Sequence, residues 1–155
     1  MPLSWLHRIP LADPPATARC GMQLAAVLQP GDIVALQGEL GAGKTTLARA
    51  VIHNLMAAAT PVPSPTFTLL QQYATPRGTV WHFDLYRIKH AEEIHELGWD
   101  DALADGIVLV EWPEHAGGYL SETALQCRLS ATPEGGRMAT LCGDDVWASR
   151  LRGIF

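Results

Sequence analysis

Lysine, asparagine and cysteine are scarce in this chain of 155 residues, and each scarcity excludes a class of protein. The chain has two lysines, Lys44 and Lys89, nine scattered arginines and a net charge of −5. A protein that binds nucleic acid without a partner needs clustered cations that neutralise phosphates, so the composition argues against direct nucleic-acid binding. Asn54 is the single asparagine and precedes a leucine, which excludes the Asn-Lys-x-Asp motif by which GTP-binding switch proteins read guanine.

The three cysteines are odd in number and far apart in the sequence. Cys20, Cys127 and Cys142 form neither a disulfide framework nor a zinc-site spacing, which predicts buried free thiols in a reducing compartment. No apolar run approaches the length of a membrane span, and the first fifteen residues lack the apolar core of a signal peptide. With a hydrophobic content of 48%, we expect one cytoplasmic domain over residues 1–155, without membrane contact.

Residues 38–46, with the sequence GELGAGKTT, fit the phosphate-binding loop pattern G-x-x-x-x-G-K-[ST]. The apolar run before the loop predicts a buried strand over residues 32–37, and the pattern after it predicts a helix over residues 45–59. The glycines let successive backbone N–H groups point at phosphate oxygens. Lys44 can reach the β- and γ-phosphates and the Thr45 hydroxyl can bind Mg²⁺, so the sequence predicts a nucleoside triphosphate site.

The other patterns predict the remainder of an α/β fold. Asp13 and Pro14 are typical of a helix start, as N-cap and first helical residue. We expect strands over residues 4–11, 66–73, 79–84, 107–110, 125–130 and 138–142, and short helices over residues 90–97, 99–104 and 144–151. Turns at residues 74–78 and 133–136 predict two hairpins. The expected fold class is a three-layer phosphate-loop NTPase, whose mixed, mostly parallel central sheet carries added antiparallel hairpins.

Two carboxylates follow strand-like runs and are candidates for a site facing the loop. Glu111 ends the run Ile-Val-Leu-Val and Asp84 ends Val-Trp-His-Phe. In open α/β sheets ligands bind beyond the carboxyl ends of the strands. Glu111 could therefore hold Mg²⁺ directly or polarise the attacking water, and the sequence leaves open whether it or Asp84 positions that water. The alternatives are a charged strand end for Glu111 and a turn or helix cap for Asp84.

Three further features have less certain roles. Ser64-Pro65-Thr66 could be a switch-like loop in which a hydroxyl senses the γ-phosphate, or an ordinary proline-rich connector. His82 alternates with two aromatic residues, which favours a structural role over a catalytic one. Trp112 could pack over the site, offer an exposed partner contact or belong to the core.

Taken in series, these motifs resemble the TsaE family, also called YjeE. The resemblance rests on GELGAGKTT, SPTFTLLQQY, HFDLYR, EIHELGWDD and LVEWPE, in that order and spacing, and runs from about Ile9 to about Glu114. This is a bacterial family of small ATPases needed for the threonylcarbamoyladenosine modification of tRNA. The C-terminal hairpin is a weaker match, and nothing is transferred to it.

The resemblance implies a protein that binds ATP or ADP with Mg²⁺, hydrolyses ATP slowly alone and works with the TsaD and TsaB proteins. Direct contact with tRNA is not expected without those partners. By position, the resemblance implies that Lys44 binds phosphates, that Thr45 and Glu111 hold Mg²⁺, and that Asp84 and Thr66 serve hydrolysis or coupling. The implied nucleotide contacts are Pro14, beside the base, and Leu40, Gly41, Ala42, Gly43, Lys44, Thr45 and Thr46.

A phosphate-loop small-molecule kinase is the remaining alternative. Such kinases use several cationic groups to hold two substrates and stabilise the transferring phosphoryl group. No arginine cluster in this sequence has the pattern of a lid over the site. The sparse cations therefore favour hydrolysis over transfer.

Overall fold

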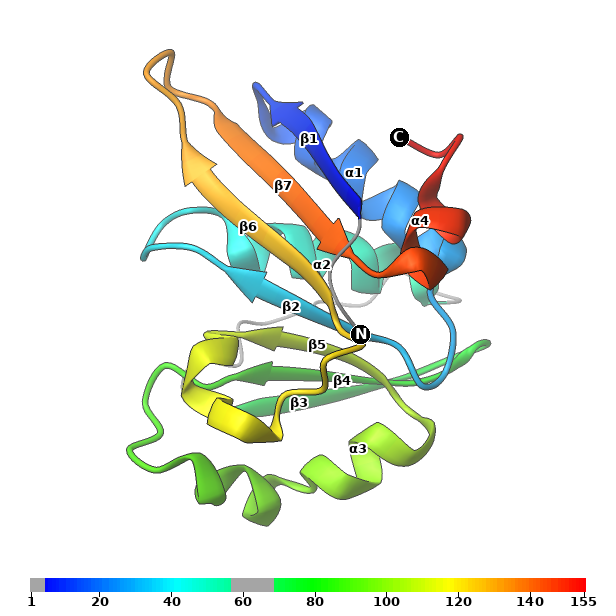
Figure 1. The fold of residues 1–155 in the computed structure, drawn as a ribbon, viewed down its shortest axis with the longest axis vertical. Coiled ribbons are helices and arrows are strands. Elements are labelled where there is room, and N and C mark those ends of the chain that lie inside the picture. Colours follow the sequence, from blue (N-terminus) through cyan, green and yellow to red (C-terminus); the bar gives the residue numbers. More distant parts are fainter. Residues whose placement is uncertain (1–4, 57–68) are drawn as a thin grey trace.

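A computed structural model describes residues 5–56 and 69–155, and its described strands form one seven-stranded sheet in the order β1-β7-β6-β2-β5-β4-β3 (Figure 1). Strands β6, β2, β5 and β4 lie parallel in the middle, whereas β1, β7 and β3 add antiparallel pairs at the two sides. The strands are β1 (Trp5–Leu11), β2 (Ile33–Gln37), β3 (Leu70–Thr75), β4 (Gly78–Asp84), β5 (Ile107–Glu111), β6 (Leu125–Ala131) and β7 (Arg137–Gly143). The predicted mixed sheet with two hairpins is confirmed.

Helices cover both faces of this sheet and give the expected three layers. One apolar core lies between the sheet and the helices α1 (Pro14–Val27), α2 (Lys44–Leu55) and α4 (Asp145–Leu151). The other lies between the sheet and α3 (Trp99–Asp105) with the 3₁₀ helices η1 (Ala91–Leu97) and η2 (Pro113–Tyr119). Because side chains alternate along a strand, β2 sends Val34 and Leu36 into the first core, and Ile33 and Ala35 into the second.

Helix α1 begins as the sequence predicts. The Asp13 carboxylate accepts a hydrogen bond from the backbone N–H of Ala16 at 2.9 Å, and Pro14 is the first helical residue. Cys20 and Leu24 of α1, and Leu28 at its C-cap, are buried in the first core. These contacts fix the start of α1, with Pro14, close to the phosphate loop.

Several boundaries differ from the sequence expectation. The strand expected over residues 66–73 is β3, which begins at Leu70, after a left-handed φ of 63° at Leu69, and ends at Thr75. Helix α2 ends at Leu55, where Met56 turns to an extended backbone, so the helix stops before the predicted limit at residue 59. The first hairpin turns more tightly than expected, because Thr75 still pairs with Gly78 and its hydroxyl donates to the Gly78 carbonyl at 2.7 Å. The left-handed φ of 130° at Gly78 permits this tight turn.

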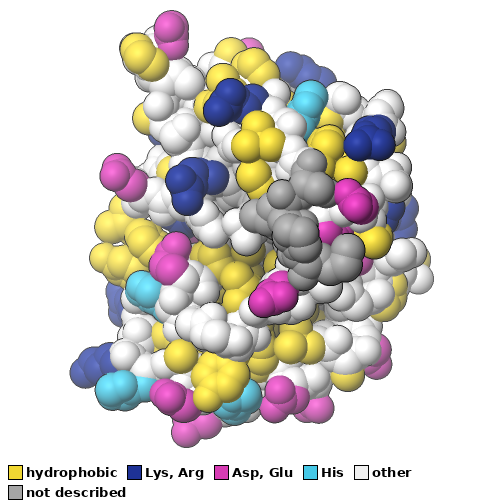
Figure 2. All heavy atoms as spheres, viewed as in Figure 1, with side chains coloured by type: hydrophobic (Ala, Val, Ile, Leu, Met, Phe, Trp, Pro, Cys, Tyr) yellow, Lys and Arg dark blue, Asp and Glu magenta, His cyan; other side chains and the backbone are white. Residues whose placement is uncertain are grey.

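The charges on the surface are distributed unevenly. Acidic side chains and histidines gather along the edge formed by η1 and α3, at the bottom of the view in Figure 2. The exposed acids there include Glu92, Glu96, Asp100, Asp101 and Asp105. This charged edge therefore faces solvent. Within residues 5–56 and 69–155, no helix combines the length and apolar character that crossing a membrane requires.

Candidate functional site

The phosphate loop connects the end of β2 to the start of α2, and its glycines are required by its shape. Gly38 has a φ of 148°, and a Cβ atom there would lie 2.6 Å from the carbonyl oxygen of Leu129 on β6. Gly43, the residue just before α2, is in a left-handed conformation with a φ of 103°. A side chain at Gly38 would clash with β6, and one at Gly43 would strain the backbone. Because both residues are glycines, the loop can pass close to β6 and lead directly into the N-terminus of α2.

Lys44 is the first residue of α2, and its ammonium group lies inside the loop. It is 5% exposed, and its Nζ donates to the carbonyl oxygens of Gly38 at 2.5 Å and of Glu39 at 2.9 Å. The same Nζ lies 4.2 Å from the ring centroid of Trp112. Burial lowers the pKa of Lys44, while the negative charges of Glu111, Glu114 and Asp84 oppose this change. The cation is thus held at the mouth of a phosphate cradle by carbonyls that an anionic ligand can replace.

Thr45 and Glu111, the two predicted metal ligands, contact each other directly. The Thr45 hydroxyl donates to the Glu111 carboxylate, at 2.8 Å from Oε1 and 3.0 Å from Oε2. Since the hydroxyl hydrogen is directed at the carboxylate, the lone pairs of Thr45 Oγ1 remain available to a cation.

This spacing suits Mg²⁺. Octahedral Mg²⁺ binds oxygens at about 2.0–2.1 Å, which places adjacent ligand oxygens about 3 Å apart. The ion is usually held by one or two protein oxygens together with substrate phosphates. Within the described part of the chain, no group of three or more His, Cys, Asp or Glu side chains could hold a metal ion. Thr45 and Glu111 therefore fit a metal that arrives with a nucleotide.

Asp84 lies beside Glu111 because the parallel register of β4 and β5 pairs these two residues. It is 4% exposed, and its Oδ1 accepts a hydrogen bond from the backbone N–H of Tyr86 at 3.0 Å. Both carboxylates open into one cavity of about 230 Å³. This cavity is lined by Leu40, Gly41, Ala42, Gly43, Lys44, Thr45, Thr46, Asp84, Tyr86, Glu111 and Trp112. The structure therefore brings together the loop residues and both strand-end carboxylates that the sequence singled out.

Pro14 faces a different side of the loop. With Asp13 and Thr17 of the α1 start, it borders a second cavity of about 310 Å³. The other walls are loop residues 41–43 with Thr46, and residues 135–137 of the β6–β7 hairpin. Thr46 and Gly43 line both cavities, so a ligand whose phosphates lie by Lys44 has room for its remaining part beside Pro14.

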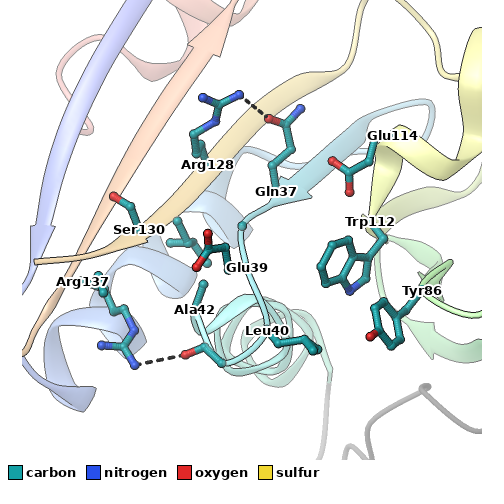
Figure 3. A pocket seen from close by; sticks show the side chains of 14 residues that line it. Gln37, Glu39, Leu40, Ala42, Tyr86, Trp112, Glu114, Arg128, Ser130 and Arg137 are labelled. Atoms are coloured by element: carbon teal, nitrogen blue, oxygen red, sulfur yellow. Dashed lines mark hydrogen bonds between the residues drawn. The ribbon is translucent and has the colours of Figure 1, made fainter.

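A third and larger hollow, of about 890 Å³, opens over the outer side of the loop (Figure 3). Figure 3 shows Arg128 and Arg137 on one side of the loop, and Trp112 and Tyr86 on the other. Arg137 donates to the Gly41 carbonyl at 3.0 Å, and Arg128 donates to the Gln37 side chain at 3.2 Å. Arg137 of the β6–β7 hairpin thereby contacts the loop from outside, and Arg128 contacts the strand that leads into it.

Trp112 packs over the site, one of the three positions that its sequence left open. Its backbone is left-handed, with a φ of 58°, and this turns the ring back over the loop. The Trp112 ring lies over the Lys44 ammonium, and the Tyr86 ring packs beside the Trp112 ring, with 4.9 Å between the two ring centroids.

His82 makes a contact that its sequence did not predict. The imidazole is fully buried, and its Nε2 lies 2.7 Å from Glu111 Oε2. One signal could have found it, because His82 is two residues before Asp84 and therefore shares its face of β4. In contrast, Thr66 and the rest of the Ser64-Pro65-Thr66 motif lie outside the described residues.

Comparisons with known proteins show which proteins this chain resembles in sequence and in fold. The model of the family described as "Threonylcarbamoyl adenosine biosynthesis protein TsaE" matches residues 11–139. A tRNA threonylcarbamoyladenosine biosynthesis protein TsaE of Rickettsia felis is 41% identical over 125 residues, covering 81% of this chain and 73% of the relative. A protein of the same name from Nostoc is 35% identical over 145 residues, covering 91% and 88%. The crystal structure of Bacillus subtilis YdiB shares the fold, with a TM-score of 0.77 at 24% identity over 99% of this chain and 96% of that one.

Proposed function

This chain belongs to the TsaE family of tRNA threonylcarbamoyladenosine biosynthesis proteins, and from that premise we propose that it is a Mg²⁺-dependent ATPase acting on the TsaD–TsaB pair. The observation that carries the proposal is the convergence of Lys44, Thr45, Glu111 and Asp84 on one cavity at the carboxyl edge of the sheet. Three of these side chains are charged and nearly buried, and residues so arranged mark functional sites more often than structural ones.

Each residue has a distinct task in this proposal. Backbone N–H groups of the loop and of the α2 N-terminus hold the phosphates, and Lys44 exchanges its contacts with the carbonyls of Gly38 and Glu39 for phosphate oxygens. Thr45 and Glu111 hold the metal side of the site. The chemistry that bound Mg²⁺ supplies is neutralisation of the charge that develops on the β- and γ-phosphate oxygens.

Asp84 is the better candidate to orient the attacking water. Glu111 already contacts Thr45 with both oxygens and His82 with one, which ties it to the metal side. Asp84 lines the same cavity beside Glu111, on the neighbouring strand. A carboxylate in that place can accept a proton from water while Glu111 keeps its ligand role.

Slow hydrolysis without a partner follows from the shortage of cations. Among the described residues that line the 230 Å³ cavity, Lys44 is the one cation. Transition-state charge in phosphoryl transfer is stabilised mainly by positioned cations, and an arginine supplied in trans accelerates it by about 10³–10⁵-fold in other phosphate-loop enzymes. A partner that supplied a cation to this site would therefore raise the rate, and we propose the TsaD–TsaB pair, in the cytoplasm, as that partner.

Partner addition tests the proposed function. ATP hydrolysis by the whole chain is measured with Mg²⁺, alone and with purified TsaD–TsaB, with Lys44→Ala as the control for contaminating ATPase. We expect a slow rate that rises on addition of the pair and is absent in Lys44→Ala. No rise, together with phosphoryl transfer to a metabolite, would favour a small-molecule kinase instead.

A further inference from the structure

We propose that His82 is a positioning residue, which holds the Glu111 carboxylate in the orientation that accepts a metal ion beside Thr45. This inference rests on the proposed Mg²⁺-dependent ATPase function. It concerns a buried histidine on β4, two residues before Asp84, on the strand that pairs with the strand of Glu111.

The contact between His82 and Glu111 is built by the sheet. β4 and β5 are parallel, and their register pairs His82 with Leu109 and Asp84 with Glu111. His82 is therefore one step below Asp84 on the face that meets α2, and its Nε2 reaches diagonally to Glu111 Oε2 at 2.7 Å. An ionised carboxylate only accepts hydrogen bonds, so Nε2 carries the proton of this bond.

Glu111 is consequently held from two sides. Thr45 of α2 donates to both of its oxygens from the loop side, and His82 donates to Oε2 from within the sheet. A glutamate side chain has three rotatable bonds, and these two donors fix the carboxylate plane against the hydroxyl that shares the metal. Charge-assisted hydrogen bonds in a buried setting are the stronger and more directional kind.

A purely structural reading explains His82 less well. The next residues down this face, Val80 on β4 and Ile107 and Leu109 on β5, are apolar and fully buried, and an apolar side chain would continue their packing. Among the described residues, the second ring nitrogen, Nδ1, has no hydrogen-bond partner. An imidazole placed only for packing would carry an unnecessary polar group into the core. The hydrogen bond to Glu111 therefore explains the imidazole better than packing does.

The proposal predicts what happens when the bond is lost. Without His82, Thr45 is the remaining described donor to the carboxylate, which is then free to turn away from the metal position. The metal requirement of the enzyme should rise, while binding of nucleotide without metal should change little.

Four variants test this with matched chemistry. His82→Leu removes the donor, His82→Gln keeps an amide N–H at the reach of Nε2, and His82→Asn keeps polarity with a side chain too short to reach Glu111. Val80→Ala is the packing control, two residues away on the same face of β4. For each variant we measure the Mg²⁺ concentration at half-maximal ATP hydrolysis with partners present, the affinity for a fluorescent ATP analogue in EDTA, and the thermal midpoint.

We expect His82→Leu and His82→Asn to need about 10–100-fold more Mg²⁺, the usual effect of losing a residue that orients a metal ligand. His82→Gln should recover most of the wild-type requirement, and Val80→Ala should lower only the thermal midpoint. Equal Mg²⁺ requirements for His82→Asn and His82→Gln would overturn the proposal, even if His82→Leu fails to fold. A wild-type protein without Mg²⁺-dependent hydrolysis would instead refute the ATPase function itself, and this inference with it.

Discussion

The two ends of the candidate nucleotide site, on either side of the phosphate loop, are built in opposite ways. The end at Lys44 and Glu111 is a small cavity of about 230 Å³ with three nearly buried charged side chains. The end at Pro14 is a cavity of about 310 Å³, lined mostly by glycines, alanines, leucines, threonines and a proline, with Asp13 and Arg137 at its border. The first end is made by buried charged side chains that share one cavity, and the second mainly by small and uncharged residues.

This difference indicates where substitutions should matter. A buried charge whose partner is removed is left uncompensated, so the loss exceeds the value of one contact. Contacts of small apolar groups with a ligand contribute little each and add nearly independently. We therefore expect substitutions at the Lys44–Glu111 end (the phosphate end) to have large, coupled effects. Substitutions at the Pro14 end (the base end) should have small effects that add independently.

The largest effect is expected for Glu111→Ala. Removing the carboxylate deletes a metal ligand and the acceptor of the Thr45 hydrogen bond, so hydrolysis should fall by about 100-fold or more. Circular dichroism should still show the folded protein. Steady-state ATPase assays check the rate, and turnover at the wild-type level in this variant would contradict the assignment.

Lys44→Ala should weaken ATP binding by about 10–100-fold, because charged hydrogen bonds to phosphate are lost from a buried position. Isothermal titration calorimetry measures this directly. The chain offers a matched control in its other lysine, since Lys89 is exposed on the approach to η1 and its replacement by alanine should leave the affinity unchanged. Unchanged ATP affinity in Lys44→Ala would contradict the role of Lys44 and its loop in phosphate binding.

Stability of the nucleotide-free protein should depend on pH through Lys44. Burial lowers the pKa of Lys44 in the folded state below the usual value of 10.5, so the unfolded chain binds the proton more tightly. The penalty for the buried charge is therefore present at low pH and is relieved as pH rises from the folded-state pKa toward 10.5. Chemical denaturation of wild type and Lys44→Met between pH 7 and 10.5 should show a gain for wild type relative to the variant. A constant difference across that range would contradict the prediction.

The smallest effect is expected at the base end. Pro14→Ala removes apolar contact area from the 310 Å³ cavity while Asp13 still caps α1, so KM for ATP should rise about threefold with kcat unchanged. Steady-state kinetics separates the two constants. A large fall in kcat would contradict the difference between the two ends, because it would show that the Pro14 end contributes to the chemical step and not only to nucleotide binding.

The sequence revealed features that depend on neighbouring residues and missed those that depend on register. The phosphate loop is one contiguous motif, and the rule for strand ends was sufficient to identify Asp84 and Glu111. The contact of His82 with Glu111 needs the β4–β5 register, which no local pattern specifies. Likewise, Trp112 reaches Lys44 only through a left-handed backbone that is rare for a bulky residue.

The fold shows the same division. Periodicity and turn residues predicted both hairpins and the strand order within them, since adjacent strands in sequence commonly pair. The early end of α2 at Leu55 was not visible, because the residues that follow, Met56 to Ala59, are good helix formers in isolation. Tertiary context decides where such a helix stops.

The most direct test of the account is the affinity of Mn²⁺, as a paramagnetic substitute for Mg²⁺, for the ATP-bound protein. Electron paramagnetic resonance measures free Mn²⁺ for wild type and Glu111→Ala, with ATP affinity in EDTA determined in parallel. If the loop and the strand-end carboxylate are two walls of one metal–nucleotide site, Glu111→Ala should bind Mn²⁺ at least about tenfold more weakly and retain its metal-free ATP affinity. Equal Mn²⁺ affinity in the two proteins would show that Glu111 is no part of that site and would contradict the central claim.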